Sequence, residues 1–326
     1  MAPPILLAIP NVSEGRSADT IAAIGDAFAG AAAPSTRESR PGAAAGDSPP
    51  AAVRLLDVHS DPDHHRSVFT LAARPGQLAD SLLRGAAAAV ALIDIVRGED
   101  ASEPARQHPH VGALDVAPVV YLERAARGAA CAEALVIADR IGSELDVPVF
   151  LYGELTGEGR APGRTRAELR RGGVRALAAR MAAGGQQSLR PDFGPARLHA
   201  SAGAVLVAAR EPLVAFNLQL APPATVEQAR AIAAAIREGG ERGLPGLRAI
   251  GVALGGGTAQ VSMNVERPLE LPLAAIVDAV RRHSPVTSAE LVGLAPAAAL
   301  DGFPEELPMP GFDPVRHLLE NALGSM

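Results

Sequence analysis

The feature that most constrains the fold of this chain is one order of elements that occurs twice. In each half, apolar runs typical of buried strands alternate with amphipathic runs typical of helices, in the order β-α-β-β-α-β. The predicted elements of the first half are strands 5–10, 53–58, 67–73 and 116–122 and helices 18–30 and 78–96. Those of the second half are strands 213–220, 247–254, 259–265 and 289–294 and helices 225–238 and 273–283.

This order is that of the ferredoxin-like (split βαβ) domain, so the sequence predicts an α+β protein of two such subdomains. We expect each to be a sheet with helices on one face, and a ligand groove to lie between the two. The boundary is expected after residue 190, where glycine- and proline-rich loop begins, which gives subdomains 1–190 and 191–326. Residues 31–52 are expected to be an insertion in the first subdomain, and residues 301–326 a tail on the second.

Composition excludes several classes of protein. With 48% hydrophobic and 20% charged residues, the chain can bury cores and is not disordered. The net charge of -6 and the lack of a basic stripe argue against a nucleic-acid partner. The single cysteine, Cys131, rules out an internal disulfide framework and fits a reducing compartment. Because the sequence contains neither a convincing signal peptide nor an apolar run of membrane-spanning length, we expect a cytoplasmic protein without membrane contact.

Chemically versatile side chains gather in two clusters, each beside an expected strand. Residues 108–118 read His-Pro-His-Val-Gly-Ala-Leu-Asp-Val-Ala-Pro, which places two imidazoles and a carboxylate at the start of a buried strand. Residues 57–66 read Asp-Val-His-Ser-Asp-Pro-Asp-His-His-Arg and are expected to connect two strands. We expect these two clusters to meet.

Two chemical interpretations remain open for the clusters. His108 can act as a general acid/base, since an imidazole pKa near 7 suits proton transfer to and from an amine, with a nearby aspartate to orient it. Alternatively, histidine and aspartate side chains bind a divalent metal that activates water. Pro109 between the two histidines and the absence of a recognised ligand spacing argue against the metal, so no metal ligand is assigned.

The arginines and the glycine run predict specific functions less strongly than the two histidine clusters do. Arg66 suits a substrate carboxylate, because a guanidinium can bind both oxygens, although a surface ion pair explains it equally well. The arginine-rich stretch that ends at Arg175 is interpreted as a solvated face. Residues 255–257, Gly-Gly-Gly, lie between two strands and predict a hairpin turn, not a dinucleotide-binding loop.

Several stretches, taken in order, resemble the glutamate formimidoyltransferase (formiminotransferase) family, whose members occur alone or fused to a cyclodeaminase. The similar blocks are residues 9–16, 57–70, 108–116, 147–154, 191–195, 215–217, 259–264 and 288–294. The resemblance implies transfer of the formimino group from N-formimino-L-glutamate to N5 of tetrahydrofolate, giving 5-formiminotetrahydrofolate and L-glutamate in histidine degradation. It also implies tetrahydrofolate as co-substrate, no metal, folate bound between two ferredoxin-like subdomains, and a homodimer.

The resemblance also implies roles for individual residues. The catalytic histidine of the family is the first residue of a His-Pro-Arg-x-Gly-Ala-x-Asp-Val motif, which is His108 here, and His110 stands where that motif has arginine. The folate loop of the family follows an Asp-Phe-Gly-Pro block, here residues 194–203. The residues expected to bind substrate or folate are His59, Arg66, His110, Asp115, Gly194, Pro195, Ala196, Arg197, Leu198, His199, Ala200, Ser201, Ala202 and Gly203.

Two functions from other classes stay open at this stage. One is a metal-dependent hydrolase that releases the formimino group to water, for which chelator-sensitive activity would be diagnostic. The other is a folate-binding protein that acts on 5-formyltetrahydrofolate, for which folate binding without turnover of formiminoglutamate would be diagnostic. Its support is His110 in place of the motif's arginine.

Overall fold

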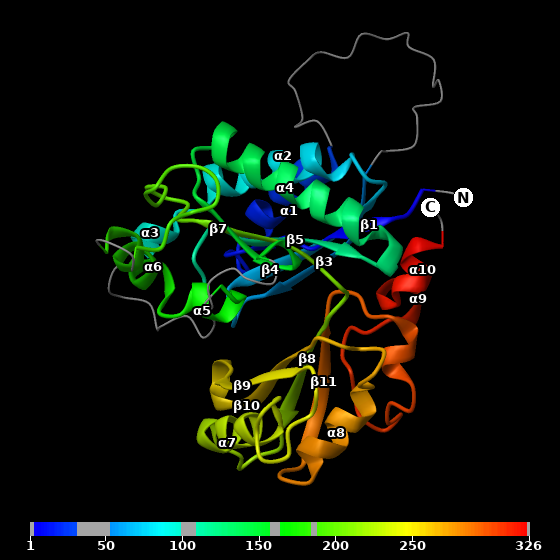
Figure 1. The fold of residues 1–326 in the computed structure, drawn as a ribbon. Coiled ribbons are helices and arrows are strands. Elements are labelled where there is room, and N and C mark those ends of the chain that lie inside the picture. Colours follow the sequence, from blue (N-terminus) through cyan, green and yellow to red (C-terminus); the bar gives the residue numbers. More distant parts are fainter. Residues whose placement is uncertain (1–2, 31–52, 99–108, 157–163, 184–187, 325–326) are drawn as a thin grey trace. The chain divides into compact units, whose positions relative to one another are not determined.

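The computed structural model describes residues 3–30, 53–98, 109–156, 164–183 and 188–324 (Figure 1). The chain divides into two compact units, residues 1–210 and 211–326. The division falls later than the expected boundary after residue 190, because residues 205–210 form a strand in the sheet of the first unit. The expected insertion at 31–52 lies outside the described residues.

The first unit is built on a mixed sheet of seven strands. Its strands are β1 (Leu6–Ala8), β2 (Asn11–Val12), β3 (Val53–Asp61), β4 (Arg66–Ala73), β5 (Leu114–Tyr121), β6 (Val149–Gly153) and β7 (Val205–Arg210). β1 lies within the predicted first strand, whereas β2 follows that strand directly, and both lie between β4 and β5. β3 pairs with the outer side of β4, and β7 and β6 extend the sheet beyond β5 by parallel pairing.

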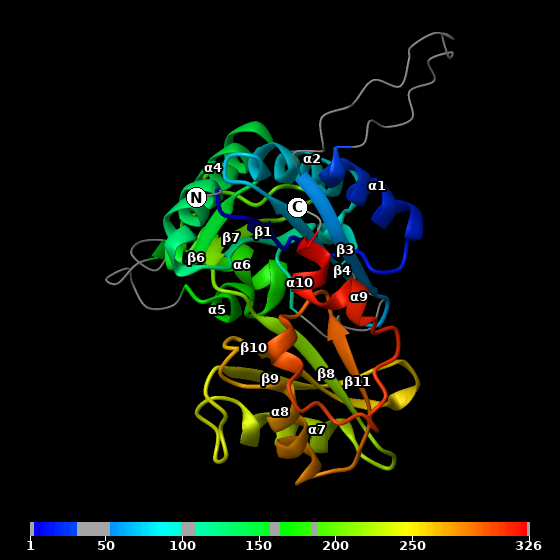
Figure 2. The same ribbon diagram turned by 90° about the vertical axis from the view of Figure 1, so that its right-hand side faces the viewer.

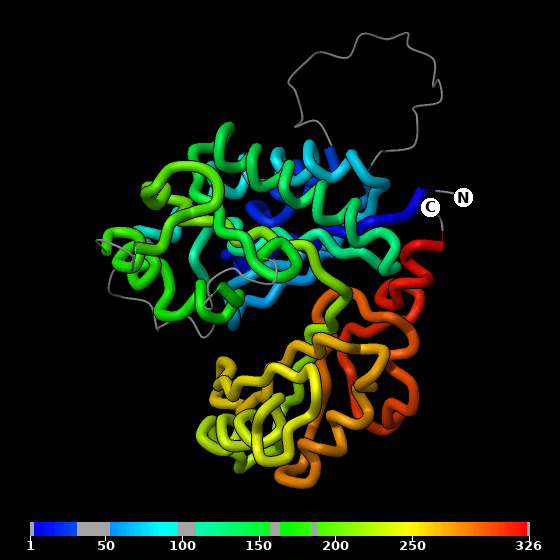
Figure 3. Tube along the Cα trace, viewed as in Figure 1, coloured from blue at the N-terminus to red at the C-terminus, as the bar shows by residue number. Residues whose placement is uncertain are grey.

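Three helices cover one face of this sheet (Figures 1 and 3). They are α1 (Ala18–Ala29), α2 (Leu78–Leu92) and α4 (Arg127–Glu144). Their apolar residues form the main core with alternate strand residues such as Phe69 and Leu71. The predicted helix 78–96 is in fact α2 followed by the short α3 (Ile95–Gly98). The 3-10 turn η1 (Arg124–Ala126) precedes α4, and the 3-10 turn η2 (Glu154–Thr156) follows β6.

The opposite face of the first sheet is also partly covered, so the expectation of helices on one face is wrong for this unit. α5 (Arg166–Arg170) and α6 (Gly173–Ala182) pack there through Leu169 and Leu177, against a second apolar cluster that includes Phe150 and Leu206. The physical reason is the parallel pairing of β5, β7 and β6. Inner parallel strands are apolar on both faces and therefore need cover on both sides.

The second unit has the predicted order of elements. Its elements are β8 (Val214–Leu220), α7 (Val226–Ile236), β9 (Leu247–Ala253), β10 (Ala259–Val265), α8 (Leu273–Arg281) and β11 (Val286–Val292). The strands form an antiparallel sheet in the order β11-β8-β10-β9. One core contains apolar residues of both helices and of alternate strand positions, so α7 and α8 cover the same face (Figure 2).

Short helices complete the second unit. They are η4 (Gly255–Gly257), η5 (Ala297–Leu300), α9 (Pro314–His317) and α10 (Leu319–Leu323). η4 is the turn of the β9–β10 hairpin, which confirms the interpretation of the three glycines. Among the helices that the structure describes, none is both long and apolar enough to span a bilayer.

The start of α7 offers a direct test of one local interaction. Thr225 caps the helix by accepting a hydrogen bond from the N–H of Gln228 at 3.3 Å, and the Gln228 side chain accepts from the N–H of Thr225 at 2.8 Å. Thr225→Ala should lower the free energy of unfolding by about 1 kcal/mol, because the cap is lost. Urea denaturation followed by circular dichroism would measure this loss. Thr225→Ser keeps a capping hydroxyl, so equal losses in both variants would contradict the capping role.

Candidate active site

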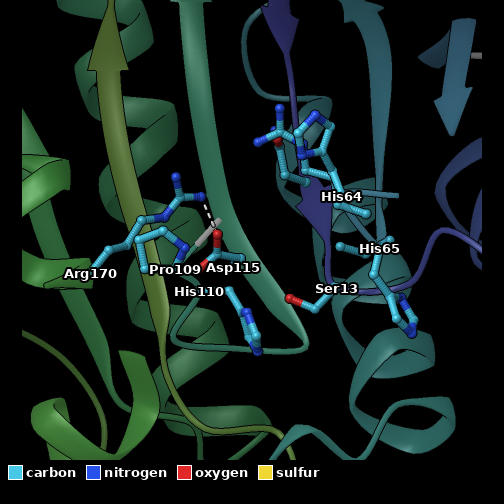
Figure 4. A pocket seen from close by; sticks show the side chains of 10 residues that line it. Ser13, His64, His65, Pro109, His110, Asp115 and Arg170 are labelled. Carbon is cyan, nitrogen blue, oxygen red and sulfur yellow. Dashed lines mark hydrogen bonds and ion pairs between the residues drawn. The ribbon is translucent and has the colours of Figure 1, made fainter. Parts of the chain in front are cut away.

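A small pocket opens to solvent at the ends of β2, β4 and β5 in the first unit, with about 300 Å³ of space including its open mouth (Figure 4). Its lining comes from the β2 segment, the β3–β4 hairpin, α5 and residues of the motif at 108–116, which is called the His-Pro-His motif below. The lining residues are Asn11, Val12, Ser13, His64, His65, Arg66, Pro109, His110, Asp115 and Arg170. The two polar clusters of the sequence therefore meet, as predicted.

The β3–β4 hairpin delivers His64, His65 and Arg66 to the pocket. β3 continues to Asp61, which pairs with Arg66, so only residues 62–65 form the turn and not the whole polar cluster. One oxygen of Asp61 accepts hydrogen bonds from the N–H groups of Asp63 at 2.8 Å and His64 at 2.9 Å. Its other oxygen lies 3.5 Å from Nε2 of His64. A single carboxylate thus shapes the turn and contacts the first imidazole.

The turn is also held from the β2–α1 loop. His65 has a left-handed backbone with φ 49°, and its Nδ1 accepts a hydrogen bond from the N–H of Gly15 at 3.3 Å. The same atom lies 3.7 Å from Oε1 of Glu14. A Cβ on Gly15 would lie 2.2 Å from the carbonyl oxygen of Asp61, so only glycine permits this close approach. The loop therefore fixes the orientation of the His65 ring.

Asp115 is turned into the pocket by an irregularity at the start of β5. The register between β2 and β5 shifts between Asn11 and Val12, as in a β-bulge, which re-aims side chains. Consequently Leu114 packs in the main core while Asp115 faces α5. One oxygen of Asp115 accepts from the N–H of Val111 at 2.8 Å, and the other accepts from the Arg170 guanidinium.

Arg66 and Arg170 make the pocket cationic. Burial lowers the pKa of Arg66 to about 10, and the positive charges of Arg170 and Arg166 act in the same direction. The carboxylates of Asp61 and Asp115 partly oppose this shift. With a pKa of about 10, Arg66 stays charged at neutral pH, so the pocket holds two guanidinium cations beside its imidazoles.

The His-Pro-His motif is bonded to the loop expected to bind folate. The N–H of Ala113 donates to the carbonyl of Ala202 at 2.9 Å, and the N–H of Ala204 donates to the carbonyl of Val111 at 2.9 Å. Between these bonds, Gly112 and Gly203 form an isolated bridge. The Ser13 hydroxyl donates to the Gly112 carbonyl at 2.7 Å, so the β2 segment is joined to the same motif.

The loop of residues 194–203 is closed on itself. The N–H of His199 donates to the carbonyl of Gly203 at 2.9 Å, and the N–H of Ala202 donates to Nδ1 of His199 at 3.0 Å. None of the loop residues belongs to the pocket lining, and the exposed Arg197 instead pairs with Asp146 at 2.6 Å. The structure thus brings the expected folate loop against the motif but outside the pocket.

Apart from the loop of residues 194–203, the expected site residues fall into three groups. Arg66, His110 and Asp115 line the pocket, and His110 is only 8% exposed. His59 lies in β3 opposite Val68, on the sheet face of Arg66, but is not part of the pocket lining. His108, expected to be catalytic, lies outside the described residues, directly before Pro109.

Sequence reasoning assigned no role to Arg170, Ser13 or Asn11, which also line the pocket. For Arg170 the interpretation of the arginine-rich stretch as a solvated face is wrong, since its side chain is only 13% exposed and is paired with Asp115. The available local signal was the Thr-x-x-Glu capping box that starts α5 at Thr165, which predicts a helix but not its partner. Across the described residues, no cluster of three or more His, Cys, Asp or Glu side chains is arranged to hold a metal ion.

Comparisons with known proteins point to one family. The profile described as "Formiminotransferase domain, N-terminal subdomain" matches residues 5–210, which is the extent of the first unit. "Glutamate formimidoyltransferase" from Streptococcus pyogenes serotype M1 is 32% identical over 326 residues, 98% of each chain. The protein of that name from Thermoplasma acidophilum is 32% identical over 315 residues, 94% of this chain and 93% of that one.

Longer proteins match as well. "Formimidoyltransferase-cyclodeaminase" from Sus scrofa is 34% identical over 304 residues, which are 90% of this chain and 50% of that one. The same name and coverage recur for a Mus musculus protein that is 33% identical over 308 residues. The chain therefore spans about half the length of these two relatives, and nearly the whole length of the two glutamate formimidoyltransferases.

Proposed function

The chain belongs to the formiminotransferase family, and from this premise we propose that it transfers the formimino group of N-formimino-L-glutamate to N5 of tetrahydrofolate. The products are 5-formiminotetrahydrofolate and L-glutamate. The observation that carries the proposal is the cationic pocket lined by Pro109 and His110 together with Arg66 and Arg170. Such a pocket suits a donor that carries two carboxylates and must be held while a proton moves.

The proposed chemistry needs one group that both accepts and donates a proton. His108, which directly precedes the pocket residue Pro109, takes the proton of folate N5 while N5 forms a bond to the formimino carbon. The tetrahedral intermediate then collapses with cleavage of the bond between that carbon and the glutamate nitrogen. The imidazolium returns its proton to the departing nitrogen, so protons and bonds balance over the reaction.

The expected fold and assembly form part of the same proposal. In the second unit the strand order β11-β8-β10-β9 corresponds to 4-1-3-2, which supports a ferredoxin-like subdomain. In the first unit the order β3-β4-β1/β2-β5 is the same arrangement read from the other edge, and β7 and β6 are additions. We extend the proposal to folate binding between two such subdomains, to a homodimer and to a cytoplasmic location, as the family resemblance implies.

The proposed reaction predicts strict dependence on folate. Purified protein should release L-glutamate from formiminoglutamate only when tetrahydrofolate is present, with equal formation of 5-formiminotetrahydrofolate, and a chelator should leave the rate unchanged. Coupled glutamate detection and the absorbance of the folate product would measure both sides of the transfer. Release of glutamate without folate would establish a hydrolase instead. Folate binding without any turnover would show that the formimino donor is wrong.

A further inference from the structure

Two guanidinium groups in the pocket have binding capacity that the described residues do not use. Arg66 begins β4 and Arg170 ends α5, so the two cations reach the pocket from different layers of the first unit. No hydrogen bond or ion pair joins the Arg66 guanidinium to any residue that the structure describes. Nε of Arg170 is buried and likewise has no hydrogen-bond partner in the described part of the chain.

The electrostatics of this pair favour an anionic ligand. The charge on Arg66 is disfavoured first by burial and then by the nearby positive charge of Arg170, and both lower the pKa of Arg66. Asp115 offers Arg170 only one oxygen, because its other oxygen accepts from the N–H of Val111. A carboxylate bound between the guanidinium groups would offset their repulsion and accept the unused N–H donors.

Arg170 is held at the pocket by more than its ion pair. The Arg180 side chain donates to the carbonyls of Glu168 at 2.8 Å and Leu169 at 2.6 Å, which ties α6 to the end of α5. Leu169 itself is buried in the apolar cluster beneath. Arg170 is therefore presented by a fixed backbone and oriented by Asp115 (Figure 4), whereas the next residue, Arg171, is exposed. Preorganisation of this kind is typical of a ligand contact.

We propose that Arg66 and Arg170 form a two-guanidinium site that binds a carboxylate of a glutamate moiety, with Asp115 as the residue that positions Arg170. The identity of the moiety rests on the proposed function, and the anion site rests on the pocket itself. The formimino donor and the glutamyl tail of folate both carry such carboxylates. The donor fits better, because the same pocket contains Pro109 and His110, which directly follow the proposed catalytic residue His108 in the sequence.

Direct binding of L-glutamate tests the site without turnover. Titration calorimetry should show Kd for L-glutamate rising about 10- to 100-fold in Arg170→Gln, because charge-assisted hydrogen bonds are lost. Arg170→Lys should bind with intermediate affinity, since it keeps the charge but not the planar fork. Arg171→Gln, at the exposed neighbouring position, is the matched control and should bind like the parent protein. Equal Kd values for the parent protein and Arg170→Gln would overturn the proposal.

Kinetics then identify which glutamate moiety is bound. If the donor occupies the site, Arg170→Gln raises KM for formiminoglutamate and leaves KM for tetrahydrofolate within about twofold. If the folate tail occupies it, Arg170→Gln raises KM for tetrahydrofolate and leaves KM for formiminoglutamate within about twofold. In that case KM for tetrahydropteroate, which lacks the glutamate, is unchanged by the substitution. Asp115→Asn should raise the same KM with little change in kcat, which a purely structural role would not produce. Unchanged KM for both substrates in Arg170→Gln would overturn the assignment.

The failure of this proposal can be told apart from failure of the proposed function. A parent protein that binds L-glutamate through Arg170 but transfers no formimino group would retain the anion site and lose the reaction. If the parent protein transfers the group and Arg170→Gln has the same Kd and KM values as the parent, the proposed reaction stands and the anion site is refuted. Should Arg170→Gln not fold, as judged by circular dichroism, Arg170→Lys and donor analogues that lack one carboxylate supply the same comparison.

Discussion

Replacement of His108 by alanine is expected to lower kcat about 10²- to 10⁴-fold, the usual contribution of a general acid/base. In the proposed reaction the same imidazole removes the N5 proton and later protonates the leaving nitrogen, so its loss affects both steps. Affinity for L-glutamate should change little, because the anion site consists of Arg66 and Arg170. Steady-state kinetics together with titration calorimetry would separate the two effects.

Two further measurements make the role of His108 specific. Added imidazole should restore part of the activity of His108→Ala, since it is the same base and can take over the proton transfer. His283→Ala, which removes an exposed histidine of the second unit, is the control and should keep kcat within about twofold. If His108→Ala retained more than about a tenth of kcat, the catalytic base would be another group, and the pocket residue His110 would be the next to test.

The second unit shows what a repeated apolar pattern can predict. α7 was expected at 225–238 and runs from Val226 to Ile236, between a capping threonine and the start of a turn. β8 is an apolar run buried at five of its seven positions, and β9 alternates buried and exposed residues over its first four. Both are local signals that need no knowledge of the partner strand. The β-α-β-β-α-β order could therefore be recognised from the sequence, although β11 begins three residues earlier than expected, at Val286.

In the first unit, the local apolar pattern does not predict which strands pair. β7 joins the sheet by parallel pairing with β5 and β6, so its partners are far away in the sequence. The boundary was expected at the glycine- and proline-rich loop after residue 190, which places residues 205–210 in the second subdomain, although β7 belongs to the sheet of the first unit. The register shift within β2, between Asn11 and Val12, depends on the pairing with β5 and has no local sequence signal.

The sequence likewise predicted those parts of the candidate site that have a local pattern, and not the part that depends on tertiary packing. The clusters at 57–66 and 108–118 were recognisable because each concentrates imidazoles and carboxylates beside an apolar run. Arg170 was not, because its partner Asp115 is 55 residues away and an arginine on a short helix is usually solvated. Only the tertiary packing of α5 against the opposite face of the sheet makes Arg170 part of the pocket.

Gly112→Ala is expected to lower the free energy of unfolding by about 3 kcal/mol or more and to weaken folate binding. A Cβ at this position would lie 1.8 Å from the carbonyl oxygen of Ala204 and 2.8 Å from that of Leu114. Both contacts are with backbone, so no side-chain rotation relieves them. The clash is relieved only if residues 111–113 move away from residues 202–204. That movement breaks the two backbone hydrogen bonds that flank the Gly112–Gly203 bridge.

Gly128→Ala is the matched control, because it makes the same chemical change within α4, where a Cβ meets nothing within 4 Å. That substitution should be neutral or should stabilise the protein by up to about 1 kcal/mol, since alanine favours the helix. Urea denaturation of both variants gives the stability difference, and titration of folate and L-glutamate gives the functional one. Because the loop expected to bind folate lies outside the pocket, Gly112→Ala should weaken folate binding more than L-glutamate binding. An equal loss of affinity for both ligands would mean that the substitution disturbs the loop and the pocket together. The loop would then have no separate role in folate binding.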